Sequence, residues 1–448
     1  MPLSRLSGIP RPLVWCGGEM SGSARERSGT PACMSERVVG SERPLAGLFV
    51  VEAASFVAGP SAGMSLAQMG AEVVRVDPPS GGSDAGRWPL SANGSSLFWA
   101  NLNKGKRSVA IDYRTPEGHE LLVALATRPG PGAGLFMDNM VGRRRVTYEE
   151  LVAQRGDVIQ VHIQGRANGG PAVDYTINAE VGVPQMTGPE DSARPVNHVV
   201  PVWDLVTGMT AVSSMLAALT RRRETGEGAK VDIALADVAL SGVGAMGWLA
   251  EAELARRARP RQGNHMFGAF GNDFVTSDGR PVMVVALTPG QWRALRDVTE
   301  TGDVFGALEK ALDANLDLET DRYRLRETIS AVLRPWFAQR DYATVSALLT
   351  QAHVLWSPYR DTFEAASEAR RDPDSVATEI DQPGIGRMLA TGSPVRWGDE
   401  RTGPVPAPRL GDDTEAVLST MLGLTQTELG GLHARGIVGL GEREPGRG

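Results

Sequence analysis

Cysteine is nearly absent from this chain of 448 residues, because its two cysteines, Cys16 and Cys33, both lie near the amino terminus. The rest of the chain therefore has no thiolate that could act as a nucleophile, bind a structural metal or form a disulfide bond. A protein body without disulfides suits a reducing compartment. We therefore predict a cytoplasmic location.

Other absences narrow the chemistry further. The histidines show neither HxH nor HExxH spacing, so no metal site is predicted. No apolar run approaches the length of about 18 residues that a membrane span needs. The formal net charge of −7 gives no global attraction to nucleic acid or anionic lipid. We therefore predict neither a membrane nor a nucleic-acid partner.

Residues 1–33 differ in composition from the rest, since they are rich in Gly, Ser, Pro and Arg and show no helical or strand periodicity. Met34 offers an alternative start. We expect residues 1–44 to be a disordered or artefactual N-terminal extension.

From Leu45 onward, apolar strands alternate with amphipathic helices. The predicted strands are 45–52, 71–77, 108–112, 135–138 and 157–163, and the predicted helices are 61–69, 116–126 and 148–154. This alternation is typical of a doubly wound parallel sheet. The predicted fold class is therefore α/β, with a Rossmann-like large domain formed by the N- and C-terminal parts of the chain.

The second half of the chain predicts a smaller domain. A hairpin turning at Asp278-Gly279 is followed by charged helices, which indicates an α+β unit. A GxGxxG pattern at 242–247 falls inside one long predicted helix, 237–258, so close helix packing explains it better than dinucleotide binding. The predicted segments are the large domain at 45–235, a linking helix and loop at 236–264, a small α+β domain at 265–350, a return to the large domain at 351–440 and a tail at 441–448.

Asp204 is the strongest candidate for chemistry. It stands at the start of an apolar helix that ends before Gly226. The first turn of a helix has unpaired N–H groups and the positive end of the helix dipole, so we expect an anion there to stay ionised. Such a carboxylate can attack an activated acyl group. The alternative is an ordinary N-cap aspartate.

Two basic clusters border predicted strands. Lys104, Lys106 and Arg107 lie at the start of the third strand, and Arg143, with two further arginines, follows the fourth. Ligands of open α/β sheets bind beyond the carboxyl ends of strands, where paired cationic loops suit a phosphorylated ligand. Alone, each cluster is better explained as a solvated surface; together they predict a polyphosphate or nucleotide ligand.

Taken in order, several segments resemble the family III coenzyme A transferases. The segments are Ala58-Gly59-Pro60, the helix and strand ending at Asp77, Asn103–Ser108, Trp203-Asp204, Glu224–Gly228 and Ala407–Gly411. The resemblance runs from about residue 45 to residue 438. It implies acyl-CoA transfer in which Asp204 carries the acyl chemistry, with coenzyme A as part of the substrate and no permanently bound cofactor. It also implies an interlocked homodimer.

The same resemblance indicates the type of reaction. Racemases of the family place a histidine where this chain has Val173, and their acidic partner is replaced by Val275, which argues against racemisation. Other segments are similar to members that move CoA between the two carboxyl groups of one dicarboxylic acid. An intermolecular transferase using the same Asp204 and a non-enzymatic acyl-CoA-binding protein are the alternatives.

We assign the CoA phosphates to the basic clusters and the acyl group to two loops. The predicted phosphate ligands are Lys104, Lys106, Arg107 and Arg143. The predicted substrate pocket consists of Val57, Gly169, Gly170, Asp174, Tyr175, Arg261, Gln262, Gly263, Asn264 and His265. Either Arg261 or His265 is expected to pair with the free carboxylate, on charge alone. Ala167-Asn168 departs from the family pattern, which has an aspartate before the glycines, and leaves the role of that loop open.

Overall fold

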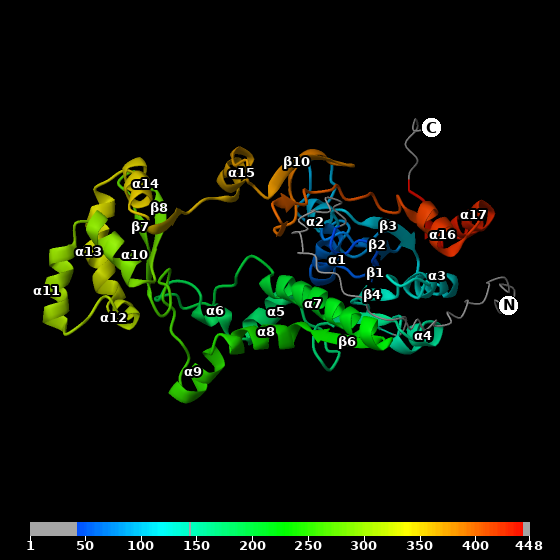
Figure 1. Ribbon diagram of the computed structural model, residues 1–448, viewed down its shortest axis with the longest axis horizontal. Coiled ribbons are helices and arrows are strands. Elements are labelled where there is room, and N and C mark those ends of the chain that lie inside the picture. Colours follow the sequence, from blue (N-terminus) through cyan, green and yellow to red (C-terminus); the bar gives the residue numbers. More distant parts are fainter. Residues whose placement is uncertain (1–42, 143–144, 442–448) are drawn as a thin grey trace, which may run out of the picture. The chain divides into compact units, whose positions relative to one another are not determined.

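The computed structural model describes residues 43–142 and 145–441, and its largest unit is a seven-stranded sheet with helices on both faces (Figure 1). Its strands are β1 (Phe49–Ala53), β2 (Glu72–Asp77), β3 (Arg107–Ile111), β4 (Leu135–Asp138), β5 (Ile159–Gln164), β6 (Ala229–Ala234) and β14 (Val438–Gly439). Their spatial order is β14-β3-β2-β1-β4-β5-β6, and every pair is parallel except β14 with β3. The predicted α/β fold with a parallel sheet is confirmed. The predicted extension at 1–44, except its last two residues, and nearly all of the tail lie outside the described residues.

Two layers of helices cover the sheet, and each layer buries its own apolar core. One layer contains α1 (Ala58–Gln68) and α7 (Val202–Thr225), and the other contains α3 (Pro116–Ala126), α4 (Tyr148–Gln154), α16 (Thr414–Leu422) and α17 (Gln426–Ala434). Because both faces are covered, β1, β2, β4 and β5 are buried along nearly their whole length, although β5 alternates apolar and polar residues. Since α16 and α17 share a core with α3, the C-terminal segment belongs to the large domain.

Among the described residues, α7 has the length and composition of a membrane-spanning helix. One side of α7, however, packs against α1 and β5 through residues such as Ala211 and Met215. The helix therefore serves as a core helix of the doubly wound domain.

The helices α1 and α7 approach each other closely at Gly208. A Cβ atom there would lie 2.3 Å from Ser61 Oγ and 2.7 Å from the backbone oxygen of Ala58. Only a residue without a side chain fits this contact, which brings the second turn of α7 to the first turn of α1.

Replacing Gly208 with alanine is expected to lower the free energy of unfolding by about 1–3 kcal/mol, because the new methyl group overpacks a rigid backbone contact. Gly244→Ala is the matched control, since its Cβ would meet only a leucine methyl at 3.5 Å. That control should be neutral or should stabilise the protein slightly. Chemical denaturation measures both values, and equal effects of the two substitutions would contradict the predicted contact.

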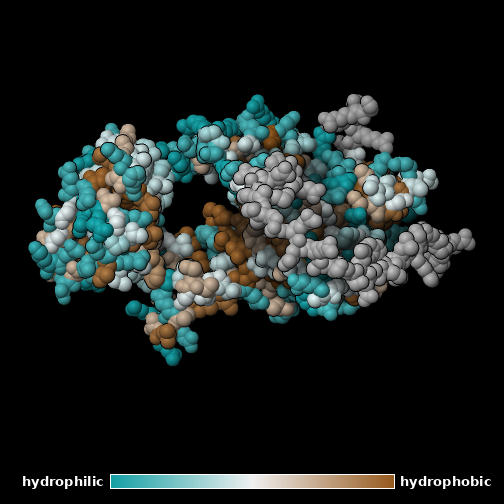
Figure 2. All heavy atoms as spheres, in the orientation of Figure 1, coloured by the Kyte–Doolittle hydropathy of each residue, from teal (hydrophilic) through white to brown (hydrophobic). Residues whose placement is uncertain are grey.

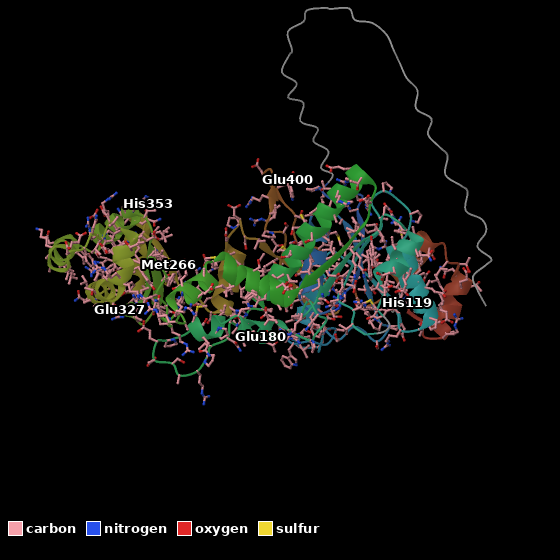
Figure 3. The ribbon with its side chains drawn as sticks, turned by 90° about the horizontal axis from the view of Figure 1, so that it is seen from below. His119, Glu180, Met266, Glu327, His353 and Glu400 are labelled. Carbon is pink, nitrogen blue, oxygen red and sulfur yellow. The ribbon has the colours of Figure 1, made fainter. Side chains whose placement is uncertain are left out.

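The small domain has its own core around a three-stranded antiparallel sheet. The strands are β7 (Phe270–Val275), β8 (Pro281–Ala286) and β9 (Leu355–Pro358), and the helices are α10 (Pro289–Val298), α11 (Gly302–Leu312), α12 (Glu319–Arg324), α13 (Arg326–Ala338) and α14 (Tyr342–Gln351). The predicted hairpin at Asp278-Gly279 is confirmed. Because β9 pairs with β8, this sheet extends past residue 350. Figure 3 labels His353 and Glu327 on this domain.

The single long helix predicted at 237–258 is wrong. The chain forms α8 (Leu235–Ala245) and α9 (Trp248–Ala255), with a break at Gly247, whose φ of 75° is incompatible with helix continuation. The glycine pattern does serve close packing, as predicted, because a Cβ on Gly242 would lie 3.0 Å from the Trp203 ring.

The remaining elements were not predicted individually. They are α2 (Leu97–Leu102), α5 (Asp174–Glu180), α6 (Val183–Met186), α15 (Thr362–Arg371), β10 (Ala377–Gln382), β11 (Gly386–Thr391), β12 (Arg396–Trp397) and β13 (Glu400–Arg401). Among them, α5 matters most for the site, because it begins with Asp174.

Candidate active site

The strand order reverses between β1 and β4, and open α/β sheets bind ligands at the carboxyl end of such a switch point. Here one side chain joins the two loops. Asn139, directly after β4, accepts from the backbone N–H of Ser55 at 3.0 Å and donates to its carbonyl oxygen at 2.9 Å. The β1–α1 loop is thereby fixed at the place where the fold predicts a ligand.

A buried ionic network supports the same loop. Glu52 is fully buried and pairs with Lys106 at 2.8 Å, while Arg75 lies 3.6 Å from Glu52 and 2.9 Å from Asp84. Asp84 in turn accepts from the backbone N–H of Phe56 at 2.8 Å. Burial of these paired charges is costly unless their geometry is satisfied, so the network defines one conformation of the loop.

The predicted phosphate ligands are in different environments. Lys106 is held by Glu52, and Arg107 bonds Glu72 at 2.8 Å and Asp413 at 3.2 Å. Both charges are thus paired with carboxylates of the protein, and their binding of phosphate stays a prediction. Arg143 lies outside the described residues.

Lys104 differs from its neighbours because its ammonium bonds only neutral groups, the Thr391 hydroxyl at 3.1 Å and the Asn101 amide oxygen at 3.5 Å. Burial lowers the pKa of Lys104 to about 8. Among the described residues of this cluster, Lys104 is therefore the one whose ammonium group has no carboxylate partner. Its binding of a CoA phosphate stays a prediction.

Asp204 is the third residue of α7, but it does not cap that helix. The backbone N–H groups of Trp203 and Asp204 donate to Asp174 Oδ2 at 2.7 Å and 3.2 Å. Asp174, which is 2% exposed at the start of α5, thus caps α7 from another element. No described residue makes a hydrogen bond to the Asp204 carboxylate, so the N-cap alternative does not apply.

The electrostatic environment of Asp204 differs from the sequence-based expectation. Burial raises its pKa to about 6, the nearby charge of Asp174 acts in the same direction, and Arg87 opposes them. The expected stabilisation of the anion by the start of α7 is wrong, because the amides of that turn bond Asp174. A poorly solvated carboxylate with this pKa is still mostly ionised at neutral pH, which favours its use as a nucleophile.

Catalysis by Asp204 is expected to have an acid limb near pH 6. The nucleophile must be deprotonated, so the rate should rise with pH through a pKa of about 6 and level off above it. A pH profile of kcat/KM between about pH 4.5 and 8 measures this limb. A profile still flat below pH 5 would show that Asp204 keeps an ordinary pKa.

His198 completes the surroundings of the carboxylates, and no sequence pattern indicated it. Its Nε2 lies 3.0 Å from Asp174 Oδ1, and its ring is adjacent to those of Tyr175 and Trp203. The Trp203 indole donates to Asn178 at 3.0 Å. Asp174 and Tyr175, two of the predicted pocket residues, therefore lie near the start of α7.

Three other predicted pocket residues lie in loops near the same sheet edge. Val57 is the N-cap residue of α1, and its side chain makes no capping hydrogen bond. Gly169, with φ of 78°, and Gly170 form a turn in the loop after β5. Their contact with an acyl group stays a prediction.

The second predicted wall has other partners. Arg261 donates to the carbonyl of Ser192, and Gln262 donates to the Tyr323 hydroxyl. His265 Nε2 lies 2.7 Å from Glu327 Oε1, and Figure 3 labels Glu327 and the neighbouring Met266. Gly263 bonds Gly188, and Asn264 is exposed. In the described part of the chain, none of these residues makes a hydrogen bond or ion pair with Asp204.

A doubly wound sheet with a desolvated carboxylate near its switch point defines an α/β enzyme with a carboxylate-centred site. A family model, CoA-transferase family III, matches residues 45–414, and the chain belongs to this family. The chain is similar to 2-methylfumaryl-CoA isomerase of Chloroflexus aurantiacus, with 49% identity over 88% of this chain and 97% of the relative. It is also similar to succinyl-CoA:mesaconate CoA-transferase of Haloarcula hispanica, with 28% identity over 83% and 94% of the two chains.

A solved structure supports the same fold. The crystal structure of a CAIB/BAIF family protein from Brucella suis matches with a TM-score of 0.68 and 26% identity, and the match covers 84% of this chain and 99% of that one. The resemblance predicted from the sequence is therefore confirmed at the level of the family.

Proposed function

We propose that this protein moves coenzyme A from the C1 to the C4 carboxyl group of 2-methylfumarate within one bound molecule. The observation that carries the proposal is the Asp204 carboxylate, which is desolvated and has no hydrogen-bond partner among the described side chains. A carboxylate in this state is available to attack a thioester carbonyl. The 49% identity to an enzyme named 2-methylfumaryl-CoA isomerase supports the choice of substrate.

The reaction follows as four acyl transfers. Asp204 attacks the C1 thioester carbonyl, which forms a mixed anhydride and releases the CoA thiolate. The thiolate then attacks the aspartyl carbonyl, which gives an aspartyl-CoA thioester and free 2-methylfumarate. The C4 carboxylate attacks that thioester, which again forms an anhydride and releases the CoA thiolate a second time. The thiolate finally attacks the C4 carbonyl and restores Asp204, so no proton is consumed or released overall.

An intermolecular transferase is the second candidate, because a relative with 28% identity is named for transfer from succinyl-CoA to mesaconate. The two candidates share Asp204 and differ in their need for an external acid.

The deciding experiment supplies purified protein with 2-methylfumaryl-CoA and no other acid, and NMR identifies the position of the thioester. Conversion to 3-methylfumaryl-CoA supports intramolecular transfer. Activity that appears only after a second carboxylic acid is added would replace it with the intermolecular reaction.

We further propose a homodimer, interlocked as the family resemblance implies. Exposed apolar side chains gather on α7, on α8 and at the end of α8 (Figure 2), and they include Leu205, Val206, Met209, Leu240 and Met246. A contiguous exposed apolar surface of this kind marks an interaction site.

The dimer is expected to persist on dilution until the protein unfolds, because interlocked chains cannot separate while folded. Light scattering and analytical ultracentrifugation over a dilution series, from micromolar protein downward, measure this. A folded monomer at low concentration would contradict the interlocked arrangement.

A further inference from the structure

Arg87, in the loop after β2, is an exposed cation that two aromatic rings position. Its guanidinium carbon lies 5.6 Å from the centre of the Phe56 ring and 5.3 Å from the centre of the Phe98 ring. Within the described residues, its guanidinium has no hydrogen-bond or ion-pair partner. Stacking against aromatic faces leaves the N–H groups at the edge of a guanidinium free for a ligand.

The buried ionic network fixes both Arg87 and one of its aromatic walls. The Asp84 carboxylate accepts from the backbone N–H of Phe56 at 2.8 Å, and the Asp84 carbonyl accepts from the backbone N–H of Arg87 at 3.1 Å. The Ser96 hydroxyl donates to the carbonyl of Arg87 at 2.5 Å. Phe56 itself has φ of 71°, a left-handed conformation that is uncommon for a bulky residue. Strain of this kind persists only where the surrounding structure imposes it.

Arg87 is also close enough to Asp204 for their charges to interact, although the two form no ion pair. The contact of Gly208 with Ala58 and Ser61 places the second turn of α7, one turn after Asp204, at the first turn of α1, which begins two residues after Phe56. The charge of Arg87 lowers the pKa of Asp204, in opposition to burial. A free cation and a free carboxylate therefore flank the same end of the two helices.

We infer that Arg87 binds the free carboxylate of a dicarboxylyl-CoA while Asp204 acts on the thioester at its other end. This inference rests on the proposed function, because only a substrate with a second carboxylate needs such a partner. An exposed planar guanidinium binds carboxylate through two parallel hydrogen bonds, which fixes orientation as well as charge. Arg87 also offsets the repulsion between the substrate anion and the carboxylates of Asp204 and Asp174.

The two cations expected from the sequence are less suitable for this task. Arg261 already donates to Ser192 and to the Gln185 side chain, and His265 is paired with Glu327. Binding substrate through Arg261 or His265 would first break these hydrogen bonds or this ion pair. The described guanidinium of Arg87 makes no hydrogen bond or ion pair that would have to be broken.

The test compares Arg87→Gln with Arg128→Gln, using 2-methylfumaryl-CoA and its analogue 2-methylbut-2-enoyl-CoA, which lacks the second carboxylate. Arg128 is a matched control, because its guanidinium also lies over a phenylalanine, at 4.4 Å from the centre of the Phe49 ring, but at the amino end of β1. The rate of CoA transfer onto the enzyme in a single turnover is measured for both substrates.

Arg87→Gln is expected to lower kcat/KM for 2-methylfumaryl-CoA by roughly 30- to 1,000-fold, the usual effect of losing one partner of a specific charge pair. Acyl transfer from the analogue should change little, and Arg128→Gln should behave as wild type. Arg87→Lys should recover part of the activity, since it keeps the charge but loses the planar fork. An Arg87→Gln enzyme that handles both substrates as wild type does, or loses both equally, would overturn the inference.

Failure of the proposed function is distinguishable from failure of this inference. If the wild type does not isomerise 2-methylfumaryl-CoA, the proposed function fails, and calorimetry then compares binding of the two thioesters by Asp204→Ala and by Asp204→Ala/Arg87→Gln. Preference for the dicarboxylyl thioester that disappears with Arg87 supports the carboxylate site. The carboxylate site is refuted if Asp204→Ala binds the two thioesters equally well. It is also refuted if the double variant still binds the dicarboxylyl thioester more tightly by the same factor. Thermal melting verifies that each variant is folded, and Arg87→Lys takes the place of Arg87→Gln if the latter is not.

Discussion

Asp204→Ala is expected to lower kcat by at least about 10⁴-fold, because every proposed step forms or breaks a bond to that carboxylate and removal of a nucleophile has effects of this size. The measurement is the isomerisation of 2-methylfumaryl-CoA under saturating substrate. Asp237→Ala is the matched control, since Asp237 is an exposed acid in the first turn of the neighbouring apolar helix α8. Activity within tenfold of wild type in Asp204→Ala would remove Asp204 from the chemistry.

A stability measurement separates loss of chemistry from loss of fold. The folded-state pKa of Asp204, about 6 against an ordinary 3.8, means that the protein loses stability as the pH rises from about 4 to about 6, and that the loss is complete above pH 6. The cost is of the order of 2–3 kcal/mol at neutral pH and disappears below about pH 4, where the group is protonated in both states. Asp204→Asn should therefore be inactive yet melt at a higher temperature than wild type at pH 7, with the difference vanishing in acid.

Asp174→Ala is expected to lower kcat by roughly 10²-fold and to destabilise the protein by about 2–4 kcal/mol. The substitution leaves the N–H groups of Trp203 and Asp204 and the ring of His198 without their acceptor, and each unsatisfied buried group costs about 1–3 kcal/mol. The start of α7 would then lose its cap, and Asp204 would lose its fixed position. Steady-state kinetics and chemical denaturation measure the two effects.

Asp174→Asn distinguishes the geometric role of Asp174 from its charge. The amide keeps one oxygen for the α7 amides but removes the negative charge that raises the pKa of Asp204. The acid limb of the pH profile should therefore move to lower pH, while kcat above the limb falls less than in Asp174→Ala. An acid limb at the wild-type pH would show that the charge of Asp174 does not affect the pKa of Asp204.

Regular elements of the large domain could be predicted because their patterns are local. The strand at 135–138 and the helices at 116–126 and 148–154 have the predicted bounds, since clear apolar periods and capping threonines define them. The helix at 237–258 was mispredicted because Gly247 takes a left-handed conformation that the apolar pattern does not reveal.

The position of Asp204 at the start of an apolar helix was readable from the sequence, but its electrostatics were not. The cap of α7 comes from Asp174, thirty positions before Asp204, and the pairing of Lys106 with Glu52 joins the residue before β3 to β1. Such contacts depend on strand order, which charge clusters in the sequence do not report. Arg87 was not predicted for the same reason, because the two aromatic rings that it contacts, Phe56 and Phe98, come from separate segments of the chain.

The most direct test of intramolecular transfer through Asp204 follows oxygen. The enzyme is given 2-methylfumaryl-CoA labelled with ¹⁸O in its C4 carboxylate, together with excess unlabelled free 2-methylfumarate, and the peptide containing Asp204 is analysed by mass spectrometry after one turnover. The proposed steps place one heavy oxygen on Asp204, because the C4 carboxylate bridges the second anhydride and its bridging oxygen stays with aspartate. An unlabelled peptide alongside product formation would contradict transfer through Asp204 within one bound molecule.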